Sequence, residues 1–368
     1  MIKRFQAECL MRLVLEKRLE QNQLMLIMTP ILSVVGVMII GVILFDALGF
    51  DGFDAVWQLF ITPVIDSYKW RDVATKAAPL ILIGLGLSIG NRAKIWNIGA
   101  EGQYIVGAIA AAGIAVLTQD LTGFWIIPLM LLAGMAGGAA YAAVPAGLKT
   151  RFGVSEVLSS LMLVYVSLQL LSYLITGPWK DPNGMNFPQT AQLTDAQLLP
   201  RELGDTGLPP GLLFALVAMI IFAVIVDRTV FGFSIRAIGE APQAARFGGF
   251  NSNQIVWSAL MISGAMAGLA GTLEVMQLTR LNLGFPSGYG FTAIIVSLLG
   301  RSHPIGVFIA GIVLAVTYVG GQVAQTVVHV PNATAGLFQA LILFAILASD
   351  IFVRYKIKIK TNKTEVQS

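Results

Sequence analysis

Long apolar runs alternate along this chain with short polar connections. About 20 apolar residues are enough for a helix to cross the roughly 30 Å hydrocarbon core of a bilayer. A membrane β-barrel would instead show alternation within segments of about 10 residues. The pattern therefore predicts an all-α, polytopic bundle of about ten membrane-spanning helices. The predicted spans lie near residues 24–45, 73–90, 97–117, 124–146, 154–175, 211–227, 255–277, 288–300, 304–322 and 333–353.

The composition agrees with a membrane protein and limits its chemistry. Hydrophobic residues make up 56% of the 368 residues, and charged residues only 12%. The 38 glycines suit close helix packing and broken helices. With one cysteine, Cys9, and two histidines, His303 and His329, the chain lacks the ligands for an intrachain disulfide or a Cys-based metal cluster. We expect no metal site and no cofactor.

The two ends of the chain are polar and basic. Residues 1–23 alternate lysine and arginine with leucine, which predicts an amphipathic leader helix along the inner membrane surface. A plain solvated leader is the alternative. Residues 354–368 form a basic tail that stops transfer. The expected domains are thus the leader, a membrane domain over 24–353 with a polar loop at 228–254, and the tail.

The placement of positive charge predicts an orientation. With the N-terminus inside, the inner segments hold 18 of the 24 lysines and arginines, and the outer segments hold the other six. Such a bias in short loops is what the positive-inside rule requires. Both termini are therefore predicted to be cytoplasmic, and the largest outer loop is Thr176–Pro210.

The loop Phe231–Gly249 (FGFSIRAIGEAPQAARFGG) is the longest polar interruption in the C-terminal half. We expect Gly239 to break one short helix, and Glu240 and Pro242 to begin the next. A carboxylate in a first turn is favoured by the helix dipole, and a proline there loses no hydrogen bond. The result would be a short helix outside the bilayer with a small-residue face, able to dock closely against a soluble partner.

Two short segments of the chain echo one another. Asn97–Tyr104 reads NIGAEGQY and Asn282–Tyr289 reads NLGFPSGY. Five predicted spans separate them, so they would be equivalent positions in two repeats of opposite orientation. Inverted repeats with broken helices are how many transporters build a pathway. The predicted span 288–300 fits this, because about 13 residues cannot cross the bilayer straight.

Glu101 is the most notable acid, because it sits among apolar and small residues, where an unpaired charge is costly. Arg92 and Lys94 are near in sequence and are candidate partners. Together with Asn97 and Gln103, Glu101 either frames a solute pathway or braces its broken helix. A bracing role, with the carboxylate binding first-turn amides, is the favoured interpretation.

Other polar groups in the spans are weaker candidates. Glu274 lies six residues before Arg280, which favours an interfacial ion pair over a substrate role. Tyr165, Gln169 and Tyr173 form one stripe at i, i+4 and i+8. Such stripes most often serve helix packing, though this one also suits a weakly polar tunnel for an uncharged solute. Similar weak pathway candidates are Asn282, Tyr289, Phe291, Gln322 and Gln325.

Motifs for catalysis are missing from the sequence. There is no GxxxxGK[ST] nucleotide-binding loop, no HExxH and no GxSxG. Ser155 and Glu156, before an apolar run, read as a simple helix cap. We therefore predict a transport subunit that is not an enzyme and binds no nucleic acid. The lack of a carboxylate and histidine relay also weakens the case for a self-sufficient secondary transporter.

Three segments carry a resemblance to a known family: Asn97–Gln103 (NIGAEGQ), Gly239–Gly249 (GEAPQAARFGG) and Gly288–Gly300 (GYGFTAIIVSLLG), which is followed by Pro304-Ile305-Gly306. They resemble signatures of permease subunits of bacterial ATP-binding-cassette (ABC) importers. The branch is the nucleoside and simple-sugar one, which depends on a basic membrane lipoprotein, within the ribose and branched-chain amino-acid permease superfamily. The resemblance covers about residues 20–350.

The resemblance implies a coupling helix in the Gly239–Gly249 loop that docks in a cytoplasmic ABC ATPase. It also implies a second permease subunit, in this branch often a paralogue, and an extracytoplasmic solute-binding protein. The implied cellular location is the inner membrane of a bacterium, where the lipid bilayer surrounds the helix bundle. The implied coupling residues are Arg236, Gly239, Glu240, Ala244, Arg246 and Gly248.

The favoured function is inward transport of a nucleoside, with a simple sugar second. One alternative is an ABC permease for another small solute, such as a branched-chain amino acid. A second alternative is a secondary transporter or channel without an ATPase partner. The Gly239–Gly249 loop discriminates these classes, because a transporter without a partner needs no docking helix.

Overall fold

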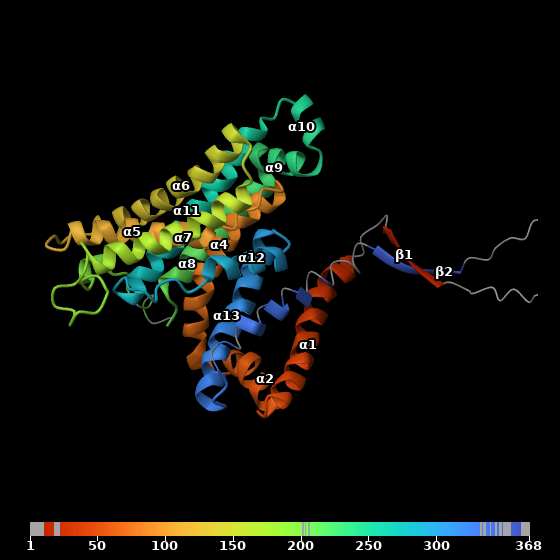
Figure 1. Cartoon of the computed structure of the whole chain (residues 1–368), viewed down its shortest axis with the longest axis horizontal. Helices are drawn as coiled ribbons and strands as arrows, with labels where there is room; N and C mark the ends of the chain where they lie inside the picture. Colours follow the sequence, from red (N-terminus) through yellow and green to blue (C-terminus); the bar gives the residue numbers. More distant parts are fainter. Residues whose placement is uncertain are drawn as a thin grey trace, which may run out of the picture. The chain divides into compact units, whose positions relative to one another are not determined.

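The computed structural model describes residues 11–17, residues 23–331 without 201, 203, 205 and 206, short runs between 333 and 348, and residues 355–361. The chain divides into two units, residues 1–56 with 336–368, and residues 57–335. Helices dominate the described chain (Figure 1). In order they are α1 (Gln23–Ala47), α2 (Gly52–Phe60), α3 (Thr62–Ile65), η1 (Ser67–Lys69), α4 (Trp70–Arg92), α5 (Ala100–Leu117), α6 (Ile126–Phe152), α7 (Glu156–Thr176), η2 (Asp195–Gln197), α8 (Pro210–Arg228), α9 (Val230–Glu240), α10 (Pro242–Phe247), α11 (Ser252–Leu278), α12 (Tyr289–Leu299) and α13 (Pro304–Val327).

Seven of the described helices are long and apolar enough to cross a membrane. They are α4 with the preceding η1 turn, α5, α6, α7, α8, α11 and α13, and each coincides with a predicted span. Helix α12 has 11 residues, which confirms that the span predicted near 288–300 is too short to cross straight. Helix α1 covers the first predicted span, and its residues Leu32–Ala47 form an apolar helical segment shorter than the seven long helices. The last predicted span, 333–353, lies largely outside the described residues. The described residues therefore support seven of the predicted spans, and the total of about ten stays a prediction.

The two ends of the chain contribute strands. Strand β1 (Met11–Lys17) pairs antiparallel with β2 (Tyr355–Thr361), with Leu13 opposite Ile359 and Leu15 opposite Ile357. The leader was expected to form a surface helix, and over these residues that expectation is wrong. Lysine alternates with apolar residues at a period of two in Tyr355–Lys360, which is the period of a strand. In β1 the same period places Met11, Leu13 and Leu15 on one face. The all-α class holds for the spans, and not for the described ends.

Helices α4 and α11 form the centre of residues 57–335. Helix α4 packs against α8, α11, α12 and α13, while α11 also packs against α5 and α6. Nearly every residue of α4 from Ala77 to Gly90 is buried. A helix that is apolar all round belongs inside a bundle, whereas a helix with one apolar stripe belongs at its surface. The core is therefore a layered set of helices around two central ones.

Glycines let three of these helices touch backbone to backbone. A Cβ atom on Gly107 of α5 would lie 2.2 Å from the Cα of Gly268 in α11. A Cβ atom on Gly138 of α6 would lie 2.1 Å from the carbonyl oxygen of Gly264, also in α11. Glycines at a spacing of four on α11 thus provide the small-residue surface that close helix crossings in membranes use.

Candidate functional site

Helices α9 and α10 form a projecting loop at one end of the bundle made by α5, α6, α7 and α11 (Figure 1). Helix α9 begins at Val230 because Thr229 caps it, its hydroxyl accepting a hydrogen bond of 3.2 Å from the Gly232 amide. The apolar residues Ile235 and Ile238 are buried on one face of α9. This buried face anchors α9 to the bundle, and the loop continues outward into α10.

The local structure of the loop differs in two respects from the sequence prediction. Gly239 was expected to break a helix, yet α9 runs through it to Glu240. A Cβ atom at Gly239 would lie 2.0 Å from the carbonyl oxygen of Arg92, so glycine is needed for close packing and not for a helix break. Glu240 ends α9 and does not begin α10. The expectation for Pro242 is confirmed, since α10 starts there.

The predicted docking residues are exposed. Glu240, Ala244, Arg246 and Gly248 all present accessible surface, while Ala245 is buried against α9. Arg236 is also exposed and donates a 3.3 Å hydrogen bond to the carbonyl oxygen of Val226. Gly239 alone of the predicted set is buried.

Phe247, in the same loop, was not among the contact residues predicted from the sequence. Its side chain is 95% exposed at the end of α10. The sequence feature that could have indicated Phe247 is a large aromatic residue among small and polar residues in a loop. Exposed aromatic residues of this kind commonly anchor protein interfaces. Phe247 therefore joins the exposed surface of α10 as a candidate contact.

A second group of polar contacts ties the base of this loop to the bundle. The Arg92 Nε donates a 2.8 Å hydrogen bond to the carbonyl oxygen of Ser302, in the turn between α12 and α13. His303 Nε2 lies 3.9 Å from an Asp227 carboxylate oxygen at the end of α8. With Gly239 packed on the Arg92 backbone, the ends of α4, α8, α9 and α12 meet here. Arg92, a candidate partner of Glu101 from the sequence, is instead bound to the Ser302 carbonyl.

Glu101 binds the N-terminus of another helix. Its two carboxylate oxygens accept hydrogen bonds from the Gly288 amide at 3.0 Å and the Gly290 amide at 2.6 Å, at the start of α12. The side chain is 3% exposed. A Cβ atom on Gly290 would lie 2.2 Å from the Glu101 amide nitrogen, so the first turns of α5 and α12 meet closely. Glu101 therefore binds helix N-terminal amides, as a bracing role requires, but the amides belong to α12 and not to its own helix α5.

Asn97 and Gln103 form a buried pair beside this junction. The Asn97 amide donates to Gln103 Oε1 at 2.8 Å and to Ser263 Oγ at 2.9 Å, and Gln103 Nε2 donates back to Asn97 Oδ1 at 3.1 Å. The Asn97 oxygen also accepts from the Gly99 amide. Both side chains use their hydrogen-bonding capacity internally, which fixes the turn before α5.

Of the remaining predicted pathway residues, Tyr289 lies at this junction, between the two glycines that bind Glu101, whereas Phe291 and Asn282 form no hydrogen bond with that carboxylate. Tyr289 is buried at the start of α12 and packs edge-on to Tyr104, with ring centroids 6.0 Å apart. Phe291 is 42% exposed. Asn282 precedes α12, where its side chain accepts a 2.9 Å hydrogen bond from the Gly284 amide and its backbone pairs with Gln189. Residues 279–284 therefore hold part of the large loop between α7 and α8.

Sequence comparison decides the family. A family model described as branched-chain amino acid transport system / permease component matches residues 71–347. The chain belongs to this family. The permease is 35% identical over 342 residues to the glucose ABC transporter permease protein TsgB13 of Haloferax volcanii, an alignment covering 90% of each chain.

Two further relatives are nucleoside permeases. The permease is 28% identical to the nucleoside ABC transporter permease protein NupB of Lactococcus lactis, over 90% of this chain and 93% of that one. It is 27% identical to the guanosine ABC transporter permease protein NupP of Bacillus subtilis, over 91% and 97%. The relatives are ABC transporter permeases, so this chain is a membrane-embedded transport subunit.

Glu274 of the permease forms an ion pair, as expected, but with a different partner. Its carboxylate lies 3.6 Å from Lys76 Nζ, which joins α11 to α4. Lys76 also lies over the Tyr289 ring, 5.4 Å from its centroid. Arg280, the partner expected from sequence, instead lies 3.6 Å from an oxygen of Asp181. The acid is 3% exposed, so this is an interior pair and not an interfacial one.

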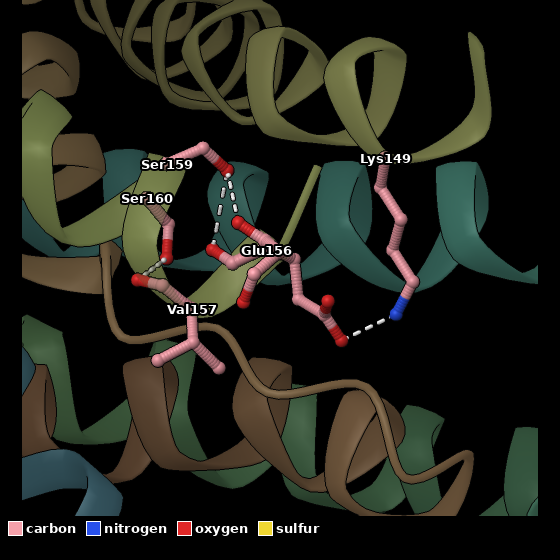
Figure 2. A network of polar contacts seen from close by, with 6 residues as sticks. Lys149, Glu156, Val157, Ser159 and Ser160 are labelled. Atoms are coloured by element: carbon pink, nitrogen blue, oxygen red, sulfur yellow. Dashed lines mark hydrogen bonds and ion pairs between the residues drawn. The ribbon is translucent and has the colours of Figure 1, made fainter. Parts of the chain in front are cut away.

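The turn between α6 and α7 shows a similar change of partner. Ser155 occupies the position before α7, but its side chain makes no capping hydrogen bond. Figure 2 shows Glu156 paired instead with Lys149 across the turn. The Ser159 hydroxyl donates to the Ser155 carbonyl at 3.0 Å, within α7. The Ser155 side chain therefore does not cap α7, and Glu156 instead forms an ion pair that joins α7 to α6.

Proposed function

We propose that this permease carries a nucleoside or a simple sugar inward across the cell membrane, driven by a separate cytoplasmic ABC ATPase. The single observation that carries the proposal is the exposed α9–α10 loop, which projects from the bundle yet is anchored on it. Its surface joins small residues to one exposed aromatic ring, a combination that fits a protein groove. The names of the similar permeases, for glucose and for nucleosides, support the solute class.

The loop is built to transmit movement as well as to dock. Because Gly239 packs directly on the Arg92 backbone, a shift of α9 displaces the end of α4. Arg92 in turn holds the Ser302 carbonyl in the turn that follows α12. A movement of the ATPase would therefore reach the short helix α12, whose other end is braced by Glu101. Rigid-body displacement of packed helices is a common way to switch such a protein between two states.

The docking proposal is tested by changing the loop surface in the complete importer. Ala244→Trp and Glu240→Lys change the packing and charge of the predicted face, and Phe247→Ala removes the aromatic ring. Met185→Ala, at an 88% exposed residue in the loop between α7 and α8, is the matched control for Phe247→Ala. Removing an interface anchor costs about 2 kcal/mol or more, which is about a thirtyfold loss of affinity.

We expect the three loop variants to retain less ATPase on copurification and to lose solute-stimulated ATP turnover, with Met185→Ala unchanged. Wild-type copurification and turnover in all three would contradict the proposal and favour a transporter without an ATPase partner. A second permease subunit, a paralogue, and an extracytoplasmic binding protein complete the proposed assembly. The solute is identified by measuring which compound the cognate binding protein retains, with a branched-chain amino acid as the alternative outcome.

The proposed orientation places both termini in the cytoplasm. It is tested in a Cys9→Ser background by labelling intact cells with a maleimide that does not cross the membrane. We expect Asn183→Cys, in the loop between α7 and α8, to be labelled and Lys358→Cys, in β2, to be protected. Labelling of the second position from outside would overturn the orientation.

A further inference from the structure

Helix α7 lies at the edge of the bundle and buries one face only. It packs against α5 and α6, and its buried residues include Val164, Ser167 and Leu171. The Ser167 hydroxyl donates to the Val164 carbonyl at 2.7 Å, so this inward polar group is satisfied within the helix. The opposite face of α7 is exposed along most of the helix.

The exposed face carries the stripe of Tyr165, Gln169 and Tyr173. The two tyrosines are 60% and 67% exposed, and Gln169 is also exposed. The spacing of four residues aligns them, and the stripe rises about 12 Å from the middle of α7 toward its C-terminal end. The stripe therefore does not serve packing within this chain, which was the commoner expectation from sequence.

Helix α8 shows what a lipid-facing surface of this protein looks like. Its exposed large side chains are aliphatic, including Val217, Ile220, Ile221 and Val224. Helices α7 and α8 are both long and apolar enough to span the membrane, and the same fraction of each apolar stretch is buried within this chain. The exposed face of α7 also carries aliphatic side chains, among them Met162, Val166 and Leu170, so the polar stripe is a narrow feature that runs beside them. The exposed large side chains of α8 include no such polar stripe.

The Gln169 amide and the Tyr165 hydroxyl, which lie further from the end of α7 than Tyr173, would have no hydrogen-bonding partner if they faced hydrocarbon. An unsatisfied amide in an apolar medium costs several kcal/mol, which is why polar groups at membrane depth face protein or water-filled cavities. The stripe therefore faces water or protein, and the aliphatic face of α8 faces lipid.

We infer that the Tyr165–Gln169–Tyr173 stripe is a solute-contacting wall of the transport pathway, closed on its other side by a second permease subunit. This inference rests on the proposed function and adds the residues that meet the solute. Hydroxyl and amide groups exchange hydrogen bonds with hydroxyls and ring nitrogens, and tyrosine rings stack on flat faces.

The stripe also selects a class of solute. It carries no formal charge, and the acid at the start of α7, Glu156, is tied to Lys149. A neutral nucleoside or sugar matches such a surface, because neither needs a counter-charge. A zwitterionic amino acid brings a carboxylate and an ammonium group that the stripe has no charged partner for.

Water access to the stripe is tested by cysteine labelling in the complete importer. In a Cys9→Ser background, Gln169→Cys is compared with Val217→Cys, a 47% exposed residue near the middle of α8. The probe is a charged methanethiosulfonate, which reacts only where water reaches the thiol. We expect labelling at position 169 to be about tenfold faster than at position 217, and to slow when guanosine or glucose is supplied with its binding protein.

Equal labelling at the two positions, or labelling at 169 that neither solute slows, overturns the inference. Labelling is scored only in preparations that retain the ATPase, so a loss of copurification counts against the proposed function and not against the stripe. The two failures are thereby distinguishable.

Solute contact is tested by removing the polar groups one at a time. Tyr165→Phe deletes only a hydroxyl, and Gln169→Leu deletes the amide at similar size. We expect initial transport rates at low solute to fall about tenfold for each hydrogen bond lost, while the ATPase still copurifies with both variants. Val217→Ala, on the lipid-facing surface, is the control. Transport at the wild-type rate by both Tyr165→Phe and Gln169→Leu would refute the inference.

Discussion

Replacing Glu101 by glutamine tests the junction between α5 and α12 directly. Both carboxylate oxygens accept a backbone hydrogen bond, from Gly288 and Gly290, whereas a glutamine offers one acceptor oxygen and turns an NH₂ group toward the other amide. A hydrogen bond to a charged group contributes about 1.5–3 kcal/mol, and a carboxylate at a helix N-terminus about 0.3–1 kcal/mol more. Relief from burying a charge offsets part of this loss, so we expect Glu101→Gln to destabilise the permease by about 2 kcal/mol.

Glu101→Ala extends the series. It removes both acceptors and leaves the buried Gly290 amide and the partly buried Gly288 amide without the carboxylate. A buried amide without a partner costs about 1–3 kcal/mol, so the effect should exceed that of glutamine. The measurement is the apparent Tm of the purified importer in detergent, together with the fraction of permease recovered in the assembled complex. Glu156→Gln is the control, because this first-turn acid of α7 pairs with a partly exposed lysine and such pairs contribute about 1 kcal/mol or less.

The expected order of Tm values is wild type, then Glu101→Gln, then Glu101→Ala, with Glu156→Gln close to wild type. A Glu101→Gln importer with wild-type Tm and recovery, but with impaired transport, would refute the bracing argument. It would place the carboxylate in the solute pathway instead.

Two further substitutions test the interior of the bundle. Lys76→Met should destabilise the permease by about 3–5 kcal/mol, because it leaves the Glu274 charge buried and unpaired. The double variant with Glu274→Gln should recover most of this loss. A double variant whose Tm is no higher than that of Lys76→Met would argue against the ion pair. Gly268→Leu should cost about 3 kcal/mol or more, since its Cβ atom would lie 2.1 Å from the Gly134 carbonyl oxygen. Gly36→Leu, at a glycine with open space around it, is the control, and equal Tm values for the two leucine variants would contradict the close crossing.

Much of the helical framework followed from the sequence because crossing a bilayer is a local requirement. A run of apolar residues of span length has few alternatives to a helix, and α7 and α8 lie where hydropathy placed them. The start of α10 at Pro242 was likewise set by one residue's own backbone geometry. The strand at Met11–Lys17 was missed because a short basic segment fits both a period of 3.6 and a period of two.

The sequence by itself thus determined where the long apolar helices lie, which loop projects from them, and which acids needed a partner. The tertiary structure alone decided who those partners are: Glu101 binds an amide 189 positions away, and Glu274 binds Lys76 and not Arg280. It also decided that Gly239 permits a contact and does not end a helix. The physical reason is that a charge buried in an apolar bundle must be satisfied, yet which group satisfies it depends on how the helices rotate and cross.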